Sequence, residues 1–417
     1  RQLRSTLKVK VKPYKRVNVF MPVKSRGEGK IRFIARAGDS IDHDGAIFEL
    51  DVRKMASLET SATYGTADSE TVIESLKFPD NIRTDTGNLF VNLSPTVIGN
   101  LEGAFKYLRD YPYSCWEQKI TKAVMASHYI NLKRYMAPDF EWKEAGEIPD
   151  IMLVLAANYQ APSGGMSFYV PQEQFVSPYL SAYTAVAFNW LKERGYRVPE
   201  SVENRLYEYL ETMLRKDVAP DFYSRGMTST VRAVTLAALA QKGRLSLDDL
   251  NRYYPHVKEM DIFGKAHFLI AASLINGAEE MSKDVFNMII SQSDQTGGKF
   301  IINEMFDDGF ERILTSPLRT NAAVLSAILA YEKGEEGKRL TKDLPFKMVR
   351  YITQTRKQGG RWENTQENVF CMNALVEYSM AYEAVNPDIN LTASIGDAAL
   401  GNAVFRDMTD APVILKR

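Results

Sequence analysis

The feature that most constrains the fold of this chain is a glycine-containing loop followed by an apolar, helix-like segment, which recurs along the sequence. The loops are centred on Gly164, Gly226, Gly297 and Gly359, which lie 62, 71 and 62 residues apart. A unit of about 60 residues suits one helical hairpin with its loops, since helices in globular proteins average about 12 residues. Several hairpins in succession predict an all-α block over residues 101–387, closed into a ring of helices, an α/α toroid.

The residues before this block have the pattern of β-structure. The stretches VNVFMPV (residues 17–23), GKIRFIARAG (29–38) and GAIFELDVR (45–53) are β-branched and aromatic runs separated by Gly, Asp and Ser. The runs TVIESLKFPDNI (71–82) and GNLFVNLSP (87–95) continue this pattern. We therefore expect the first 55 residues to be the back half of a β-sandwich.

The two ends of the sequence add to this organisation. The N-terminal RQLRSTLKVKVK has no continuous apolar segment and reads as the middle of a strand, which suggests a piece cut from a longer chain. After Pro387 the sequence INLTASIGDAALGNAVFRD is again β-like. The predicted fold class is therefore multidomain, with an all-α toroid inserted between β-sandwich segments.

Composition excludes several classes of protein. The 417 residues are too many for one ordinary domain, and 45% hydrophobic with 25% charged residues is typical of a globular protein. Lys+Arg and Asp+Glu both number 52, which argues against a nucleic-acid binder or a polybasic membrane-surface protein. No apolar run reaches the roughly 18 residues of a transmembrane helix. We expect no transmembrane segment and no nucleic-acid partner.

The stretch YPYSCWEQ (111–118) carries the candidate chemistry. Cys115 and Gln118 are three residues apart, so on a helix they are neighbours, and Pro112 suits a helix start. The N–H groups of a helix N-terminus would lower the pKa of the thiol. Such a cysteine could attack the glutamine carboxamide, release ammonia and close an internal thioester. On the plainer interpretation Cys115 is a core thiol; with Cys371 it could also form a disulfide, or both could be buried thiols.

The extended string resembles the thioester signature of the α2-macroglobulin and complement family, in its bacterial form. Two further stretches, GGMSFYVPQEQFVSPYLSAYTA and GGRWENTQENVFCMNALVEY, resemble later loops and inner helices of the same family, in the same order. The resemblance covers nearly the whole chain. It implies four parts, which are the C-terminal part of a macroglobulin-like β-sandwich (1–55), the first part of a CUB-like β domain (56–100), the toroid thioester domain (101–387) and the return into the CUB-like domain (388–417).

The resemblance also assigns the site. Cys115 would supply the sulfur and Gln118 the acyl carbon of a β-cysteinyl-γ-glutamyl thioester, an internal cross-link that needs no cofactor and no metal. Its shielding environment would include Tyr111, Tyr113, Trp116 and Glu117. Ser114 and Trp116 depart from the glycine and leucine that are commoner in the family. Three aromatic residues of the repeat loops fit either the shield or the loop cores, namely Phe168, Tyr169 and Trp362.

The function implied by this resemblance is that of a broad-spectrum proteinase inhibitor rather than an enzyme. Cleavage of a bait segment elsewhere in the full protein would expose the thioester, which would acylate lysines of the target protease. Small amines such as methylamine would inactivate it. The same resemblance implies a periplasmic or other extracytoplasmic location, with the full-length protein a candidate for a lipid anchor.

Complement proteins of this family use a catalytic histidine that first accepts the acyl group and favours hydroxyl acceptors. The segment Gly164–Tyr183, where the family would place it, contains no histidine. His128 lies thirteen residues after Cys115, about 220° around an ideal helix and so on its far side. His43 lies in the β region, and His256 and His267 suit ordinary polar or core positions. We therefore expect no catalytic histidine and direct aminolysis.

The sequence features bear on three alternative functions. A cysteine hydrolase needs a histidine base near Cys115, and no motif offers one. Terpenoid cyclases and prenyltransferases also use helical toroids, but FDDGFE (306–311) and SLDDLN (246–251) have the wrong spacing for their acidic motifs and suit loop acids and a helix cap. The remaining alternative is a thioester-inactive structural or partner-binding module of a bacterial envelope complex.

Overall fold

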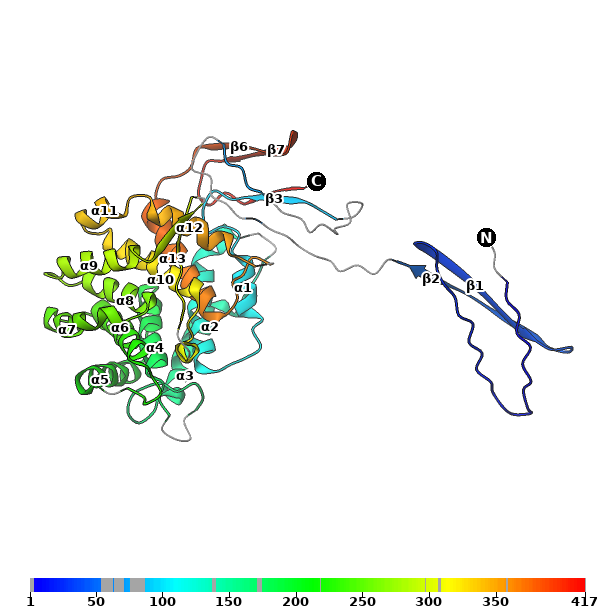
Figure 1. Cartoon of the computed structure of the whole chain (residues 1–417), viewed down its shortest axis with the longest axis horizontal. Helices are drawn as coiled ribbons and strands as arrows, with labels where there is room; N and C mark the ends of the chain where they lie inside the picture. The colour runs from blue at the N-terminus through cyan, green and yellow to red at the C-terminus, as the bar shows by residue number, and fades with distance from the viewer. Residues whose placement is uncertain are drawn as a thin grey trace. The chain divides into compact units, whose positions relative to one another are not determined.

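The computed structural model describes residues 4–53, 63, 71–75, 87–136, 140–170, 175–217, 219–296, 298–306, 309–357 and 359–416. The chain divides into two compact units, residues 1–60 and residues 61–417 (Figure 1). The first unit is β-structured and the second carries all the described helices.

The first unit is built on one long β-hairpin. Strands β1 (Gly29–Gly38) and β2 (His43–Val52) are antiparallel, with Gly29 opposite Val52 and Gly38 opposite His43. The Phe33 and Phe48 rings stack at 5.1 Å on one face. The strands predicted at residues 29–38 and 45–53 are confirmed. The strands predicted at residues 17–23 and over residues 4–12 of the N-terminal stretch are wrong, because a strand needs a hydrogen-bonded neighbour and the described part of this unit offers them none. Residues 1–3 of that stretch lie outside the described residues.

The second unit is mainly helical, as predicted. Its α-helices are α1 (Glu102–Arg109), α2 (Trp116–Leu132), α3 (Ile148–Leu155), α4 (Pro178–Glu193), α5 (Glu200–Lys216), α6 (Arg225–Gln241), α7 (Leu247–Tyr253), α8 (Ile262–Ser273), α9 (Glu279–Ile290), α10 (Pro317–Tyr331), α11 (Glu335–Thr341), α12 (Leu344–Gln354) and α13 (Thr365–Tyr382). Short 3₁₀ turns occur at Lys133–Tyr135, Lys143–Gly146, Ala156–Tyr159, Tyr254–Glu259 and Phe310–Ile313.

Six of these helices form an inner layer. Helix α2 contacts α4, which contacts α6; the series continues through α8, α10 and α13, and α13 contacts α2 again. The inner helices are apolar or small on nearly all sides, and α4 is buried continuously from Pro178 to Leu191. Outer helices bury only one stripe, as α5 does with Val202, Leu206 and Leu210. This difference in polarity decides which helices lie inside.

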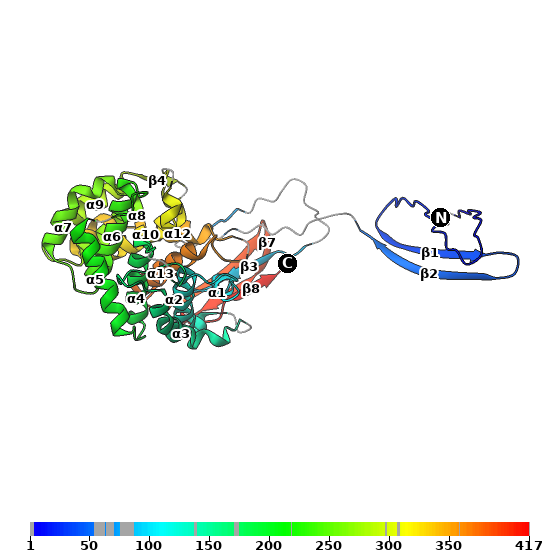
Figure 2. The same cartoon turned by 90° about the horizontal axis from the view of Figure 1, so that it is seen from below.

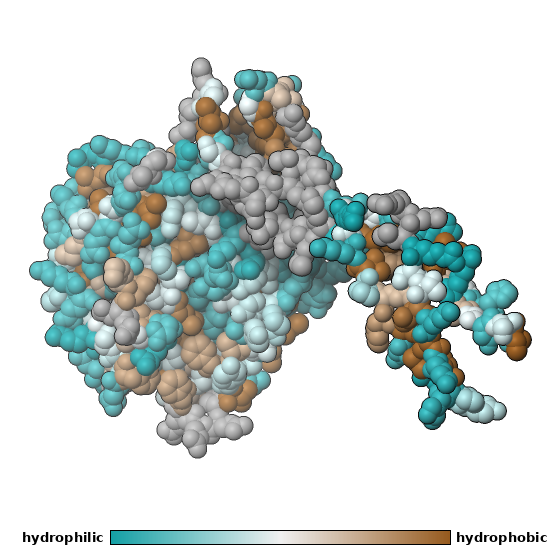
Figure 3. All heavy atoms as spheres, turned by 45° about the vertical axis from the view of Figure 1, so that its right-hand side comes forward, coloured by the Kyte–Doolittle hydropathy of each residue, from teal (hydrophilic) through white to brown (hydrophobic). Residues whose placement is uncertain are grey.

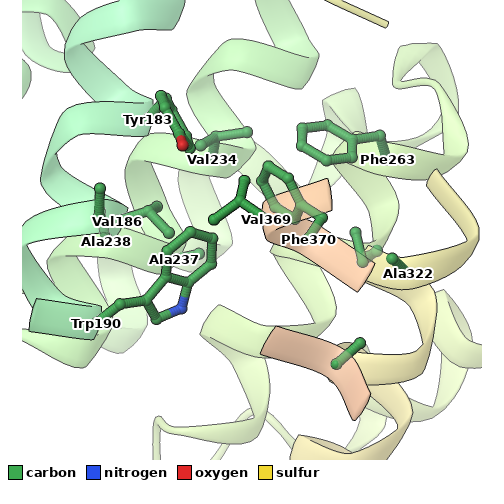
Figure 4. Close-up of a cluster of buried hydrophobic side chains, with 14 of the residues drawn as sticks. Tyr183, Val186, Trp190, Val234, Ala237, Ala238, Phe263, Ala322, Val369 and Phe370 are labelled. Atoms are coloured by element: carbon green, nitrogen blue, oxygen red, sulfur yellow. The ribbon is translucent and has the colours of Figure 1, made fainter. Parts of the chain in front are cut away.

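The centre of the inner layer is an aromatic cluster contributed by different helices (Figure 4). The Phe370 ring of α13 lies 5.4 Å from the rings of both Trp190 on α4 and Phe263 on α8. Tyr183 on α4 lies 6.1 Å from Phe370. These large side chains pack across small residues of α6 and α10, such as Ala237 and Ala322, so the helices approach one another closely.

The helix starts follow simple capping chemistry. Side-chain oxygens of the N-cap residues accept hydrogen bonds from backbone N–H groups of the first turn in α4, α6, α7, α8, α10 and α13, through Ser177, Ser224, Ser246, Asp261, Ser316 and Asn364. At α7, Ser246 and Asp249 form a reciprocal capping box. The helix cap predicted for SLDDLN is therefore confirmed, whereas Asp307 and Asp308 of FDDGFE lie outside the described residues.

The predicted repeat was only partly right. Gly226 is the second residue of α6 rather than part of a preceding loop, and Gly297 lies outside the described residues. The glycine pattern also missed the inner helix Ile262–Ser273, because an Asp cap rather than a glycine loop precedes it. The long interval between Gly226 and Gly297 contains this missed helix.

The second unit also contains short strands. Strand β3 (Phe90–Leu93) pairs with β8 (Val413–Lys416), and β6 (Ile389–Ile395) pairs with β7 (Ala398–Phe405). Figure 2 shows β3, β7 and β8 together beside the helices. The β-structure predicted after Pro387 and within residues 87–95 is confirmed. Residues 71–75 form no strand, and residues 76–82 of the same predicted run lie outside the described part.

A further hairpin was not predicted, with β4 (Ser293–Thr296) paired to β5 (Lys299–Ile302). The division into four domains stays a prediction. Among the described residues, no helix combines the length and apolar character needed to cross a membrane.

Candidate functional site

The structure brings Cys115 and Gln118 together in one turn. Cys115 is the N-cap of α2, with extended backbone (φ −67°, ψ 170°), and Gln118 is the third helical residue. The Cys115 backbone N–H donates to Gln118 Oε1 at 2.9 Å. In return the Gln118 backbone N–H faces the Cys115 sulfur, which completes a reciprocal capping arrangement. The helix begins at Trp116, so Pro112 lies in the extended lead-in rather than in the first turn.

The site lies just below the surface. Cys115 is 9% exposed and Gln118 is half-buried. Burial raises the pKa of the Cys115 thiol, and the nearby Glu117 carboxylate adds to this, while the Gln118 backbone N–H acts in the opposite direction. The lowered pKa that we predicted from the helix N-terminus is therefore wrong. Loss of solvent around the sulfur outweighs the contribution of the helix N–H groups.

The hydrogen bond between Cys115 and Gln118 has a chemical consequence. It places a backbone donor on the carbonyl oxygen that would take up negative charge if the sulfur attacked the carboxamide carbon. The two groups belong to one helical turn, so the attack would be intramolecular. The turn therefore brings together the thiol, the carboxamide and the backbone donor that an acyl transfer between these side chains would need.

Trp116, one of the predicted shield residues, lies in the interior next to the turn. It is fully buried, and its Nε1–H donates to Thr184 Oγ1 on α4 at 2.9 Å. Its ring stacks on Tyr159 at 5.1 Å, and its backbone N–H donates to Phe168 O at 2.7 Å. Of the predicted loop aromatics, Phe168 therefore does contact the turn, through its backbone.

The loop around Gly164 brings Tyr159 and Phe168 to this position. Gln160 and Met166 form a short antiparallel bridge, and the Ser167 N–H donates to Tyr159 O at 2.9 Å. Gly164 has a φ of +93°, and a Cβ there would meet a backbone oxygen of α5 at 2.2 Å. Sequence reasoning missed Tyr159, which precedes the glycine loop and matches no quoted motif.

The tyrosines before Cys115 form a row on the surface. Tyr111 meets Tyr107 edge-on at 5.2 Å and Tyr113 at 5.7 Å. Arg361 lies over the Tyr107 ring at 4.7 Å. Tyr113 is 69% exposed, so its ring does not enclose the Cys115 sulfur completely in this chain.

The other two predicted shield residues differ in their exposure. Tyr169 is 73% exposed. Trp362 is fully buried, where its Nε1–H donates to Ile352 O at 3.0 Å and its backbone N–H donates to Asn368 Oδ1 at 3.2 Å. Trp362 is a core residue that anchors its loop to α12 and α13, which fits the loop-core interpretation, and a shielding role for it stays a prediction.

Glu117 points into the helical interior and is 3% exposed. Its Oε1 accepts from Gln366 Nε2 at 2.8 Å, from Thr365 Oγ1 at 2.9 Å and from Thr121 Oγ1 at 3.0 Å. Burial raises the pKa of Glu117, and these three donors oppose that rise by stabilising the carboxylate. A solvated helix face, the plainer interpretation of Glu117, is wrong.

The histidines have their contacts elsewhere. His128 lies in the interior, with Nε2 2.7 Å from Asn373 Oδ1 and 2.8 Å from Arg194 Nη2. His267 is a core residue whose ring lies 4.3 Å from Phe263. His43 is exposed on β2, and His256 lies 3.7 Å from a surface glutamate. These contacts of His128 involve neither Cys115 nor Gln118, and the absence of a catalytic histidine stays a prediction.

Cys115 and Cys371 are both buried and are not joined by a disulfide. Cys371 lies on α13 and is fully buried, and burial raises the pKa of its thiol well above the usual value. Of the two cysteines, only Cys115 has partial access to solvent.

Comparison with known proteins gives a consistent picture of the fold. No family model matches the chain. The structure resembles native alpha-2-macroglobulin from Escherichia coli, from domain MG7 to the C-terminus, with a TM-score of 0.60, 19% identity, and coverage of 94% of this chain and 62% of that one. It resembles methylamine-reacted Salmonella alpha-2-macroglobulin with a TM-score of 0.59 and 19% identity, over 94% of this chain and 26% of that one.

A curated sequence relative is circularly permutated Ras protein 2 of Dictyostelium discoideum. It is 20% identical over 405 residues, which is 90% of this chain and 10% of the relative. The chain therefore spans only part of every protein compared. The resemblance expected from the sequence motifs is confirmed at the level of the fold: over 94% of its length, this chain folds like the C-terminal region of the bacterial alpha-2-macroglobulins.

Proposed function

We propose that this chain is the thioester-bearing part of a broad-spectrum proteinase inhibitor of the alpha-2-macroglobulin family. The observation that carries this proposal is the Cys115–Gln118 turn, in which the N-cap N–H donates to the glutamine carbonyl oxygen at 2.9 Å. The fold likeness to alpha-2-macroglobulins adds support, since structures of those proteins were solved after reaction with methylamine, trypsin and elastase. On this proposal the chain is an inhibitor and not an enzyme.

The thioester would form between the two side chains of the turn. The Cys115 sulfur bonds to the Gln118 carboxamide carbon, the carbon–nitrogen bond breaks, and the thiol proton leaves with the nitrogen as ammonia. The Cys115 N–H stabilises the charge on the carbonyl oxygen during this exchange. No metal or cofactor takes part.

Reaction with a target protease opens the thioester and transfers the Gln118 acyl group from sulfur to nitrogen. A lysine amine of the protease attacks the acyl carbon, a carbon–nitrogen bond forms, and the carbon–sulfur bond breaks to give a free thiol that takes the amine proton. At neutral pH only about one lysine in 2,500 is uncharged, so the amine must be held next to the thioester to react quickly. Cleavage of the bait segment elsewhere in the full protein would expose the thioester while the protease, with its lysines, is still in contact with the inhibitor.

The architecture proposed for this function is an α/α toroid flanked by macroglobulin-like and CUB-like β segments. The cyclic order of contacts through α2, α4, α6, α8, α10 and α13 supports the toroid. The pairing of β3 with β8 brings residues on both sides of the helical block into one sheet, which supports an inserted helical domain. A periplasmic location, with a lipid anchor on the full-length protein, is part of the same proposal.

Covalent capture of a protease tests this function. The full-length protein is incubated with trypsin, and adducts that survive denaturation are detected on a reducing gel. We expect adducts with the unmodified protein and none with Cys115→Ser or after treatment with methylamine. Adducts of equal yield in all three samples would contradict a thioester mechanism, and their absence from all three would favour the thioester-inactive structural module.

A further inference from the structure

The second unit buries two oppositely charged side chains far apart in the sequence. Glu117 is 3% exposed and Arg319, on α10, is fully buried. An ionised side chain in the interior is costly unless a partner charge and hydrogen bonds compensate it. The carboxylates of Asp261 and Glu304 lie near enough to Arg319 to interact with its charge. Among the described residues no ion pair joins Arg319 to Glu117, so any link between these two side chains is indirect.

A chain of hydrogen bonds joins them. Arg319 Nη1 donates to Tyr179 OH at 2.6 Å, and Tyr179 OH donates to Gln366 Oε1 at 2.7 Å. Gln366 Nε2 then donates to Glu117 Oε1 at 2.8 Å. Every donor in this relay points toward the carboxylate, so each bond polarises the next in the same sense. The relay links α10, α4, α13 and α2.

The cationic end of the relay is held firmly in place. Arg319 Nη1 also donates to Ile313 O at 2.6 Å, and Nη2 donates to Thr315 Oγ1 at 3.1 Å. The guanidinium lies over the Phe263 ring, 3.8 Å from its centre. A planar group fixed on both edges and one face has little freedom to move away from Tyr179.

The carboxylate end is next to the reactive turn. Glu117 lies between Cys115 and Gln118 in the sequence, and its inward orientation fixes the rotation of the first turn of α2. A second branch supports it, in which Tyr183 OH lies 2.6 Å from Thr121 Oγ1 and Thr121 donates to Glu117. If the carboxylate lost its donors, burial would favour turning it toward solvent, and Cys115 and Gln118 would turn with it.

We infer that Arg319 is a positioning residue for the thioester, acting through Tyr179 and Gln366 on Glu117 to hold the Cys115–Gln118 turn in the geometry for ring closure. This inference rests on the proposed thioester function. It assigns a role in the site to a residue of α10, which touches neither Cys115 nor Gln118.

The test compares variants of the full-length protein. Tyr179→Phe removes only the hydroxyl of the relay and keeps both charged ends. Tyr207→Phe is the matched control, because Tyr207 is equally buried and its hydroxyl donates to Asn189 Oδ1 at 2.8 Å in an unconnected contact. Arg319→Met removes the cationic end. The fraction of molecules lacking ammonia is measured by intact mass, with a melting curve beside it.

We expect Tyr179→Phe and Arg319→Met to lower the thioester fraction about fivefold or more, because this is the scale of one lost buried hydrogen bond. Tyr207→Phe should lower the melting temperature by a similar amount and leave the thioester fraction unchanged. In a Glu117→Gln background, neither change should lower the fraction further, because both act through the carboxylate. This non-additivity distinguishes positioning from general destabilisation.

Two outcomes overturn the inference in distinguishable ways. A wild-type protein with full thioester content, and Tyr179→Phe indistinguishable from Tyr207→Phe, would remove the role of Arg319 and leave the proposed function intact. A wild-type protein without any thioester would overturn both. If Arg319→Met does not fold, Tyr179→Phe decides the question alone.

Discussion

Cys115 serves two purposes at one position. As the N-cap of α2, Cys115 places its sulfur opposite the backbone N–H of Gln118. Because this sulfur also lies beside the Gln118 carboxamide, it is the candidate acceptor of the Gln118 acyl group. The raised pKa of the Cys115 thiol means that the free thiol is not primed for reaction with other reagents. On the proposed function, the reactivity of this turn would come from the proximity of Cys115 to Gln118 rather than from an acidic thiol.

Substitutions that keep the cap should separate structure from chemistry. Serine is a good N-cap and glutamate a good third residue, so Cys115→Ser and Gln118→Glu should each change the free energy of unfolding by no more than about 1 kcal/mol. Neither variant can close a thioester. Thermal melting and methylamine incorporation are the two measurements.

A large drop in melting temperature in both variants would mean that the turn is mainly structural. Methylamine incorporation by either variant would mean that the acyl donor lies elsewhere in the chain.

The placement of the histidines predicts the choice of acceptor. His128 contacts Asn373 and Arg194 in the interior rather than the Cys115–Gln118 turn, which supports the prediction that no histidine takes the acyl group first. We expect methylamine to label Gln118 much faster than glycerol at equal concentration, as followed by peptide mass mapping. Equal labelling by glycerol would contradict direct aminolysis.

At this scale the sequence allowed only part of the site to be predicted. The Cys115–Gln118 pair was predictable because both residues lie in one helical turn. The contacts of Glu117 were not, because Thr365 and Gln366 lie 248 and 249 residues away. Tyr159 and the inward orientation of Trp116 likewise depend on loops that only the fold brings together.

At the scale of elements, the start of α1 depends on a close backbone approach. A Cβ on Gly103 would lie 1.7 Å from Gly359 O, so α1 packs directly on the loop before α13. Gly103→Ala should therefore destabilise the fold by about 1–3 kcal/mol, as overpacking does. Chemical denaturation measures this.

Gly146→Ala is the matched control, because a Cβ there meets nothing within 4 Å. Equal stability of the two variants would show that α1 can move away from the loop without cost.

The contact between α4 and α13 predicts a pH dependence. Burial raises the pKa of Glu377 to about 7, the nearby Glu193 adds to this, and Ser326, Arg194 and Lys333 oppose it. The unfolded chain loses this proton near pH 4.5, whereas the folded protein keeps it until about pH 7. Deprotonation between these values therefore favours the unfolded state, and the stability contributed by this group falls as pH rises through that window.

Replacing Glu377 by Gln should remove that loss. We expect Glu377→Gln to be more stable than the parent by about 1–3 kcal/mol at pH 8, and the difference to shrink as the pH approaches 4.5. Denaturation at a series of pH values checks this, and a constant difference across the series would contradict it.

Helices and strands could be predicted from the sequence where the local residue pattern agrees with the packing that the fold provides. The hairpin β1–β2 was predicted almost to the residue, because alternation and turn residues mark both strands. The stretch at residues 17–23 is also rich in β-branched and aromatic residues but has no partner strand among the described residues. Residue type alone therefore gave a wrong strand prediction there. Helix α8 escaped the repeat pattern because Asp261 rather than a glycine loop starts it.

At the scale of the whole molecule, the chain divides into a β-structured unit and a mainly helical unit. The helical unit has an apolar interior. On the face that Figure 3 shows, its surface is largely hydrophilic with scattered hydrophobic side chains. Its six inner helices contact one another in a cycle, and the α2 start that carries Cys115 belongs to that cycle. Structural likeness to alpha-2-macroglobulins extends over 94% of the chain, although identity is only 19%. The shared fold and the Cys115–Gln118 turn are independent reasons for the same proposed function.

The most direct test of this account is the intact mass of freshly purified protein before and after incubation with methylamine. The account predicts a mass about 17 Da below that of the unmodified sequence, from loss of one ammonia, and a gain of about 31 Da after methylamine, together with a newly alkylatable Cys115. An unmodified mass, no gain with methylamine and a Cys115 that is freely alkylated from the outset would contradict it.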